Sequence, residues 1–583
     1  MYKINKELAK IFEEMAAYYR FKGSGDRFRV IAYQNAARVL DHLTEDVRDF
    51  TEDELVDISD IGEGIAAKIR EYIETGSIDK YEELNREIPH DFVELLKIQG
   101  IGPETLKTLH EELGVSSREQ LLEVLNSGKV QELKGFGEKT VKNLLEGLKE
   151  SQKADERMLL AEALHIVEEL ETQLGKCKEL QKLEFAGSLR RMKTTVGDID
   201  ILATAKPGNR EKVLDHFVSM PGVTKVLAQG DTKASVVMDT DSCQVDLRLV
   251  DDDQWGAALL YFTGSKDHNV HLRTIAKEKG WKINEYGIYD TKTDKKLAGK
   301  TEDEMYKKLG LAWIPPEMRE NRGEIELAAN KTLPRLIEQA DIKGDFHLHS
   351  DWSDGVNEIE ELARYVHKNY DYEYLILTDH SKSSRIAGGL TEEELSEQRE
   401  VIQGVNQKLG IPFIKTGSEV DILADGSLDF DDDILAKLDW VTASIHSLFN
   451  QDNTERILKA CENPYVCAIS HPTGRLIGKR KEYPVDLNKV IKKAKETGTA
   501  LEINAQPQRM DLDDHWARQA QEQGVMLVIG TDSHDLMSFG YMKMGVGLAR
   551  RAWCQADHIL NTRSWKEIEQ FVQQKRKKAK ALQ

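Results

Sequence analysis

Apolar and polar residues follow three different patterns along the chain. From residue 1 to about 150, apolar residues recur at spacings of three and four, which predicts helices and no strand. From about 155 to 320, a long amphipathic helix at 158–170 precedes short apolar strands, and after 340 such strands alternate with helices. This order predicts a multidomain protein with an all-helical part, an α+β part and an α/β part, the last a barrel or a doubly wound sheet.

The expected strands form two sets, separated by a helical connector near 321–343. The strands of the α+β part are 182–187, 198–204, 235–239 and 244–250. The strands of the α/β part are 344–350, 374–381, 412–422, 440–447, 466–472, 500–507 and 525–534.

Composition narrows the class of protein. A chain of 583 residues is long enough for several domains, and the absence of an apolar run of about 18 residues or of an apolar leader predicts a cytoplasmic protein without a membrane partner. Five scattered cysteines without a C-x-x-C pair indicate neither a disulfide framework nor a thiolate zinc site. The net charge of −21 argues only weakly against DNA, because binding uses local patches or divalent metals.

A glycine turn before an amphipathic helix occurs three times in the helical part. The copies are DIGEGIAAKI (60–69), GIGPETLKTL (100–109) and GFGEKTVKNL (135–144). Such a turn exposes backbone N–H groups where a phosphate binds well, although a single copy is explained by the need to turn. The three copies resemble helix-hairpin-helix motifs, with Asp60 of the first in place of a glycine. The predicted contacts to the DNA backbone are Gly62, Gly64, Gly100, Gly102, Gly135 and Gly137.

Three aspartates of the α+β part suggest a site for divalent cations. Asp198 and Asp200 are two residues apart on an expected strand, so both carboxylates leave the same face about 6–7 Å apart along the backbone. Asp246 lies on another apolar strand that can pair alongside. Three convergent carboxylates can hold the Mg²⁺ ions that activate a 3′-hydroxyl and position a triphosphate. An isolated D-x-D would more often be solvated, but here a Gly187-Ser188 turn and arginines precede it.

The motifs GS…GDIDIL, VDLRL, YFTGS and GWKINEYGIY, in this order, resemble family X DNA polymerases, the relatives of polymerase beta. The resemblance implies that Asp198, Asp200 and Asp246 bind Mg²⁺ and that Asp246 also activates the primer hydroxyl. Lys266 follows YFTGS where the family has an acidic residue, which suggests a cation that strengthens nucleotide binding. The implied contacts to the incoming nucleotide are Gly187, Ser188, Arg191, Gly197, Tyr261, Phe262, Gly264, Lys266, Asn269 and Arg273.

Lys68 of GIAAKI matches the lysine with which some family members form a Schiff base to a 5′-deoxyribose phosphate. Tyr33 of IAYQNAA matches the tyrosine beside it. A lysine on such a helix otherwise contacts a phosphate, so both interpretations stay open.

Histidines and acidic residues occupy the ends of six of the seven strands expected after residue 340. Strand ends of an α/β barrel meet at one rim, so these side chains are expected to converge. Imidazole and carboxylate without thiolate suit Mn²⁺, Zn²⁺ or Fe²⁺ rather than Ca²⁺. With Asp354 included, the predicted ligands are His347, His349, Asp354, His380, Glu419, His446, His471, Asp532 and His534.

This set resembles the PHP (polymerase and histidinol phosphatase) domain, a seven-stranded α/β barrel with a trinuclear metal centre. The resemblance implies two to three ions, Mn²⁺ or Zn²⁺, that support phosphoester hydrolysis. Arg475 of HPTGR is a candidate phosphate contact. The implied ligand groups are His347, His349, Glu419 and Asp532; Asp354, His380 and His534; and Glu419, His446 and His471.

Together the motifs resemble the bacterial family X polymerases that carry a carboxyl-terminal PHP domain. The implied function is the filling of short gaps in base excision repair at the nucleoid, on gapped or primer-template DNA with dNTPs. The barrel is expected to add 3′→5′ exonuclease activity, with AP endonuclease or 3′-phosphatase activity as further options. Two alternatives stay open, a DNA-end phosphoesterase whose front half delivers DNA and a scaffold without turnover.

The resemblance also implies the domain boundaries. The expected domains are an amino-terminal helical domain (1–90), a fingers-type helix-hairpin-helix subdomain (91–153), the palm (154–262), the thumb-type subdomain (263–320), a linker (321–340) and the PHP domain (341–575).

Overall fold

The computed structural model describes most of the chain. The described residues are 3–22, 27–42, 46–58, 61–87, 95, 101, 103–133, 136–137, 140–141, 144–145, 148, 157–240 and 243–581. Two compact units divide the chain, Met1–Glu156 and Arg157–Gln583. Within these described ranges, no helix is long and apolar enough to cross a membrane.

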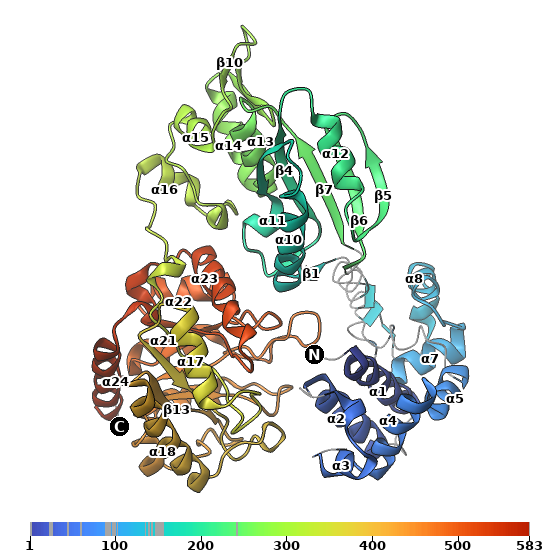
Figure 1. The fold of residues 1–583 in the computed structure, drawn as a ribbon, viewed down its shortest axis with the longest axis vertical. Coiled ribbons are helices and arrows are strands. Elements are labelled where there is room, and N and C mark those ends of the chain that lie inside the picture. The colour runs from blue at the N-terminus through green and yellow to red at the C-terminus, as the bar shows by residue number, and fades with distance from the viewer. Residues whose placement is uncertain are drawn as a thin grey trace. The chain divides into compact units, whose positions relative to one another are not determined.

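The amino-terminal unit contains helices and no strand among its described residues, as the apolar spacing predicts (Figure 1). Leu8, Phe12 and Leu40 are fully buried in its core. Local signals define the helix ends, since Thr51 and Glu54 form a capping box at the start of α3. The helices are α1 (Lys3–Lys22), α2 (Arg27–His42), η2 (Val47–Asp49), α3 (Glu52–Asp57), α4 (Glu63–Thr75), α5 (Asp79–Glu87), α7 (Pro103–Leu113), α8 (Arg118–Asn126) and η3 (Lys129–Glu132).

The second unit begins with a five-stranded sheet in the order β2-β4-β7-β6-β5. Only the pair β4 and β7 is parallel; the other neighbours are antiparallel. Helix α12 packs on β5, β6 and β7 (Figure 1). The elements are β1 (Met158–Leu159), α10 (Leu160–Leu174), β2 (Leu180–Phe185), α11 (Gly187–Arg190), β3 (Thr195–Val196), β4 (Ile199–Ala205), α12 (Arg210–Val218), β5 (Val223–Gln229), β6 (Lys233–Met238) and β7 (Gln244–Leu249).

Two details differ from the expected strands. The strand expected at 198–204 begins at Ile199, so Asp198 lies in the bend before β4 and not on the strand itself. Strand β5 was not expected, because as an edge strand it is exposed along nearly its whole length and lacks a buried apolar face.

A helical layer and a small antiparallel sheet, β10-β9-β8, follow. Gly256 permits a close approach, because a Cβ there would lie 2.0 Å from the carbonyl carbon of Thr301. The elements are α13 (Trp255–Thr263), α14 (Lys266–Glu278), β8 (Trp281–Asn284), β9 (Gly287–Asp290), β10 (Lys296–Ala298), α15 (Glu302–Leu309), η5 (Pro316–Met318), α16 (Glu324–Asn330) and η6 (Gln339–Asp341).

The rest of the chain forms a barrel of seven parallel strands in sequence order, which confirms the predicted α/β barrel. A parallel bridge between Leu348 and Ser533 connects the ends of the first and last strands, so the sheet nearly closes. The strands are β11 (Gly344–Asp345), β12 (Tyr374–Leu377), β13 (Ile414–Asp421), β14 (Trp440–Ser444), β15 (Ala468–Ile469), β16 (Ala500–Asn504) and β17 (Leu527–Gly530).

Helices follow the barrel strands and cover the outside, as expected for parallel strands. They are α17 (Ile359–Asn369), α18 (Glu392–Leu409), α19 (Asp432–Leu435), α20 (Thr454–Glu462), α21 (Leu487–Thr497), α22 (Asp514–Glu522), α23 (Met542–Arg551) and α24 (Trp565–Lys580), with the short helices η7 (Arg385–Ala387), η8 (Met537–Tyr541), η9 (Ala556–His558) and η10 (Leu560–Thr562).

Glu302 joins the five-stranded sheet to the layer that follows it. Its carboxylate accepts hydrogen bonds from Arg190 at 2.9 Å and from Arg319 at 2.5 Å, and the Arg319 side chain is fully buried. Burial opposes ionisation, but the attraction of Arg319 and the hydrogen bonds from both arginines lower the pKa of Glu302 to about 2. The carboxylate therefore stays charged between its two partners.

Replacing Glu302 by alanine is expected to destabilise the protein by about 3–5 kcal/mol, because it leaves two largely buried guanidinium groups without their carboxylate. Asp303→Ala, which removes a neighbouring surface carboxylate paired with Lys307, is the control and is expected to cost less than about 1 kcal/mol. Urea unfolding of the three proteins measures the difference. Equal midpoints for the two variants would show that the Glu302 network does not stabilise the fold.

Candidate metal centres and nucleotide site

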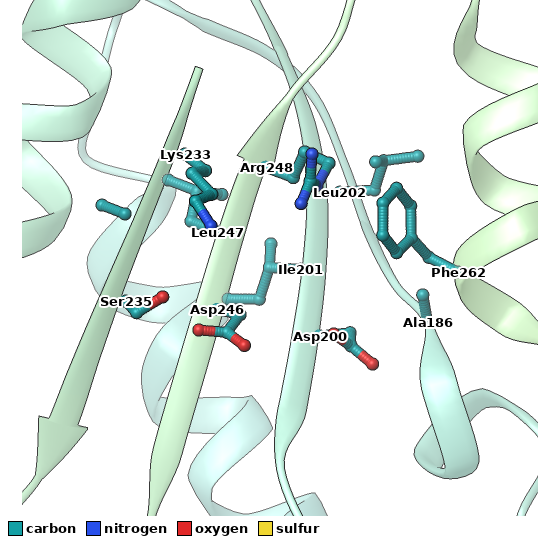
Figure 2. A pocket seen from close by; sticks show the side chains of 11 residues that line it. Ala186, Asp200, Ile201, Leu202, Lys233, Ser235, Asp246, Leu247, Arg248 and Phe262 are labelled. Atoms are coloured by element: carbon teal, nitrogen blue, oxygen red, sulfur yellow. The ribbon is translucent and has the colours of Figure 1, made fainter. Parts of the chain in front are cut away.

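Three aspartates converge on the five-stranded sheet. The parallel register of β4 and β7 places Asp200 directly opposite Asp246, and both side chains line the same pocket in Figure 2. Asp198 reaches the pair from the bend before β4, and one carboxylate oxygen of each residue lies within 4.8 Å of the others. The structure thus brings the three predicted carboxylates together.

The carboxylates repel one another. Burial, with the negative charges of Asp198 and Asp246, raises the pKa of Asp200 to about 7. A divalent cation would remove this repulsion, and clustered carboxylate oxygens are the ligands that Mg²⁺ prefers. The residues present therefore fit a divalent metal.

A glycine lets the predicted triphosphate turn approach this cluster. Gly187 has φ +63°, and a Cβ there would lie 2.5 Å from Asp200 Oδ2. A hydrogen bond of 3.1 Å from the Lys193 N–H to the Ser188 carbonyl closes this turn. Gly197 immediately precedes Asp198 in the chain. The Gly187 turn therefore lies directly against the carboxylates.

A cavity of about 140 Å³ opens beside Asp200 and Asp246 (Figure 2). Phe262 lines it, and the Arg248 guanidinium lies 4.6 Å from the centre of the Phe262 ring. Lys233 and Arg248, which the sequence reasoning missed, bring positive charge to the cavity. Arg248 follows Asp246 by two residues on β7, so strand periodicity could have placed it on the same face, whereas nothing in its own segment distinguishes Lys233.

The remaining predicted nucleotide contacts lie around the turn between α13 and α14. Asn269 Nδ2 donates to the Tyr261 carbonyl at 2.8 Å, and Arg273 Nε donates to the Asn269 carbonyl at 3.3 Å. These three residues line one shallow pocket. Lys266 is the first residue of α14 and is exposed.

Arg191 is held by neighbours of its own chain. Its Nη1 donates to the Thr263 carbonyl, and its Nε lies 3.1 Å from Glu320 Oε1. A Cβ on Gly264, which has φ +67°, would lie 3.3 Å from Arg191 Nη1. The predicted triphosphate arginine is thus packed directly beneath the YFTGS turn.

The nine predicted barrel ligands form one connected cluster at the rim of the barrel. Glu419 lies at its centre, with Oε1 at 2.9 Å from His471 Nε2 and Oε2 at 3.0 Å from His380 Nδ1. Three groups have ligand atoms within 4.8 Å of one another; they are His347, His349 and Asp532; His349, Asp354, His380 and His534; and His380, Glu419 and His446. These groups overlap with those expected but differ in detail: His349 and His380 each belong to two groups, Glu419 is not in the first, and His471 is in none of the three.

Several buried ring nitrogens without a hydrogen bond indicate which ligand this cluster can bind. His347 Nε2, both ring nitrogens of His349, His380 Nδ1 and His471 Nδ1 are buried without a hydrogen-bond partner among the described residues. Orphaned buried polar atoms are costly, and a bound metal satisfies such atoms. The donor set therefore fits divalent metals. The same groups oppose protonation of His349, because burial and the nearby His534 and His380 lower its pKa to about 4.

Buried carboxylates that the sequence reasoning missed orient several of these imidazoles. Glu502 accepts hydrogen bonds from His347 Nδ1 at 2.7 Å and from the His471 N–H at 2.8 Å. Asp421 accepts one from His446 Nδ1 at 2.6 Å. Such second carboxylates fix the tautomer and orientation of metal-binding histidines. Glu502 lies on β16, the one strand without a predicted ligand, where an acidic residue in a buried apolar strand was the available signal.

Arg475, the candidate phosphate contact, donates its hydrogen bonds to backbone carbonyls of a neighbouring loop. Its Nε donates to the Arg509 carbonyl at 2.8 Å and its Nη2 donates to the Met510 carbonyl, so the side chain supports that loop. Arg509, in turn, places Nε 3.1 Å from Asp532 Oδ2.

The glycine turns are described only in part. Gly62 is the residue before α4 and provides no side-chain cap. Gly64 lies in the exposed first turn of this helix, and its carbonyl accepts a hydrogen bond from Lys68 Nζ at 2.8 Å. Gly137 is exposed and accepts the Val141 N–H at 3.1 Å. Asp60, Gly100, Gly102 and Gly135 lie outside the described residues.

Lys68 and Tyr33 have contrasting surroundings. Burial is the main cause that lowers the pKa of Lys68, which favours the neutral amine that a Schiff base requires. Tyr33 is buried and stacks on Tyr19 with ring centres 5.5 Å apart.

Comparison with known proteins shows the family to which the chain belongs. The sequence matches the helix-hairpin-helix domain over residues 3–78, the SAM-like helix-hairpin-helix tandem over 92–150 and the DNA polymerase beta thumb over 258–320. It is 42% identical over 573 residues to the "DNA polymerase/3'-5' exonuclease PolX" of Bacillus subtilis (strain 168), an alignment that covers 97% of this chain and 99% of that protein. The chain belongs to the bacterial family X DNA polymerases with a PHP domain.

Other relatives match parts of this family X member. A "Probable phosphatase" of Thermoanaerobacter sp. (strain X514) is 31% identical over 249 residues, which cover 40% of this chain and 96% of that protein. "DNA polymerase lambda" of Rattus norvegicus is 25% identical over 342 residues, which cover 54% of this chain and 56% of that protein. The two kinds of relative correspond to the two kinds of site.

Glu502→Gln is expected to weaken Mn²⁺ binding to the barrel by about 10–100-fold, because His347 loses the carboxylate that orients it. Equilibrium dialysis against Mn²⁺ measures the effect in this family X member. Glu496→Gln, on the exposed side of α21, is the control. Equal Mn²⁺ affinity in the two variants would contradict the orienting role of Glu502.

Proposed function

We propose that the protein fills short gaps in DNA by two-metal nucleotidyl transfer and degrades DNA 3′ ends with a second, metal-dependent site in the barrel. The observation that carries this proposal is the presence of two separate ligand clusters, one of carboxylates on the five-stranded sheet and one of imidazoles and carboxylates on the barrel. The helix-hairpin-helix and thumb matches support DNA as the substrate.

At the sheet, Asp198, Asp200 and Asp246 would hold two Mg²⁺ ions. When bound, these ions activate a 3′-hydroxyl and neutralise the triphosphate. Asp246 accepts the proton of the primer hydroxyl, and Arg191 with the turn at Gly187 and Ser188 binds the phosphates. Tyr261 and Phe262 form the wall against the sugar, as their edge-to-face contact beside the cavity supports.

Other residues bind the rest of the nucleotide. Lys266 adds a positive charge where relatives of polymerase beta have an acidic residue, and Asn269 and Arg273 face the new base pair. Asn269 donates to the Tyr261 carbonyl and Arg273 donates to the Asn269 carbonyl, which supports a shared role.

At the barrel, the nine clustered side chains would hold two to three ions, Mn²⁺ or Zn²⁺. When bound, such ions activate water and neutralise a scissile phosphate. Glu502 orients His347 and Asp421 orients His446, and Arg509 lies close enough to the cluster to meet a phosphate. The same chemistry would serve AP endonuclease or 3′-phosphatase reactions.

The biological setting follows from these two activities. A nucleotide-adding site and a 3′-trimming site in one chain suit base excision repair, at the nucleoid and beside other repair proteins. The predicted domain boundaries divide this work between the palm and thumb for synthesis and the PHP domain for degradation.

A second candidate function is a phosphoesterase whose front half only delivers DNA. The relatives named as probable phosphatases favour it for the barrel. The close carboxylate cluster beside a cavity with Lys233 and Arg248 favours synthesis as well.

Single-gap DNA with dNTPs and Mg²⁺ or Mn²⁺ separates the two sites. Asp198→Ala is expected to reduce nucleotide addition by about 10³-fold or more and to leave 3′ degradation intact, because it removes only the sheet ligand. His347→Ala combined with His349→Ala is expected to do the reverse. Asp252→Ala, which removes an exposed carboxylate paired with Lys182, is the control and should change neither activity.

Loss of both activities in either ligand variant would contradict the proposed division of labour. Absence of nucleotide addition by the wild-type protein would leave the phosphoesterase as the better function.

Lyase activity is tested by covalent trapping. With an incised abasic site, borohydride is expected to link the DNA to the wild-type protein and not to Lys68→Ala, because the neutral Lys68 amine forms the Schiff base. Lys80→Ala serves as a nearby surface-lysine control. Equal trapping in Lys68→Ala would remove Lys68 as the nucleophile, and absent trapping in all proteins would leave it a phosphate contact.

A further inference from the structure

A barrel arginine holds the turn that carries the predicted triphosphate contact. Arg551, the last residue of α23, has a side chain only 4% exposed. Its Nη1 donates to the Arg191 carbonyl at 2.8 Å, across 360 residues of sequence. The same residue donates to Glu320 at 3.0 Å and to Asp514 at 2.7 Å. The Arg551 guanidinium thus connects the Arg191 turn, the segment at Glu320 and the barrel residue Asp514.

Arg191 and Arg551 share one carboxylate. Glu320 Oε1 accepts from Arg551 Nη1 and from Arg191 Nε, the latter at 3.1 Å. Burial opposes the charge of Glu320, but Arg551 and Arg191 together lower its pKa. Without Arg551, Glu320 would lose one of its two guanidinium partners, and its negative charge would act more strongly on Arg191. A tighter pair between Glu320 and Arg191 competes with any phosphate for the same guanidinium.

Packing seats the same turn on α23. Met192 has a left-handed backbone with φ +53°, and its side chain lies against Gly547. A Cβ on Gly547 would lie 2.5 Å from Met192 Cε and 3.2 Å from Met192 Cβ. The helix therefore leaves space for Met192, and the turn is fixed from both its carbonyl side and its side-chain side.

The segment that follows Glu320 is held by both α14 and the barrel. Glu324 accepts a hydrogen bond from Nδ1 of His268, a residue of α14, at 2.7 Å, and Arg322 Nη2 donates to Asp514 of the barrel at 2.8 Å. Both Asp514 contacts, from Arg322 and from Arg551, end on the same oxygen. The end of α23 therefore contacts both the Arg191 turn and the segment around Glu320 and Arg322 directly.

We infer that Arg551 of the barrel is a positioning residue for nucleotide addition, because it fixes the Arg191 turn and shares the charge of Glu320, which leaves Arg191 available to a triphosphate. This inference rests on the proposed function, in which Arg191 contacts the incoming nucleotide. It gives the barrel a role in synthesis that does not depend on its metal centre.

Steady-state addition of one dNTP to single-gap DNA by the full-length protein tests the inference. Arg551→Ala is expected to raise the KM for dNTP about tenfold while kcat changes less, because a charge-assisted contact is lost around the binding residue and not at the reacting atoms. The matched control is Arg550→Ala on the same helix, which contacts Glu317 and the Ile337 carbonyl but not the Arg191 turn. It should leave the KM unchanged.

A second substitution distinguishes positioning from general damage. Adding Glu320→Gln to Arg551→Ala is expected to bring the KM back by several-fold, because it removes the charge that Arg551 no longer shares. A purely structural role predicts a further loss instead. Degradation of DNA 3′ ends, measured on the same samples, reports whether the barrel is folded and should match wild type.

The outcomes separate the two proposals. If Asp198→Ala is inactive in addition but Arg551→Ala has the KM of Arg550→Ala, the inference is wrong and the proposed function stands. If Asp198→Ala adds nucleotides normally, the proposed function itself fails. If Arg551→Ala does not fold, Arg551→Lys replaces it, because lysine keeps the charge but lacks the planar guanidinium with its several donors. An unchanged KM for dNTP in Arg551→Lys would also overturn the inference.

Discussion

Both sites depend on polar groups whose burial or mutual repulsion the protein's own side chains do not fully compensate. On the sheet, burial and two neighbouring carboxylates raise the pKa of Asp200 to about 7. On the barrel, His347 Nε2, both ring nitrogens of His349 and His380 Nδ1 are buried and make no hydrogen bond among the described residues. Each arrangement costs stability unless an external charge compensates it, and a divalent cation compensates both. The surrounding fold is best understood as the framework that keeps these groups together.

The two frameworks achieve this by different means. In the sheet, one parallel pair, β4 with β7, sets Asp200 against Asp246, and Gly187 lets a turn approach them. In the barrel, seven parallel strands bring their ends to one rim, and Glu502 and Asp421 orient the imidazoles from behind. Precise orientation therefore comes from strand register in one site and from a second layer of carboxylates in the other.

Much of this could be predicted from the sequence because the signals are local. Apolar runs predicted all seven barrel strands, six of them ending in histidine or acid, and D-x-D with VDLRL predicted the three sheet carboxylates. What escaped prediction depends on tertiary contact. β5 has no buried face of its own, Glu502 acts through His347 from 155 residues away, and Arg191 meets Arg551 across 360 residues. Periodicity contains no information about such pairs.

The central claim is that two chemically distinct clusters in one chain each bind divalent cations. Anomalous diffraction at the manganese edge, from crystals of the full-length protein grown with Mn²⁺, tests it most directly. The account predicts separate anomalous peaks, at least one among Asp198, Asp200 and Asp246 and at least two among the barrel side chains around Glu419. Peaks confined to one cluster, or an empty barrel rim in a crystal whose carboxylate cluster is occupied, would contradict it.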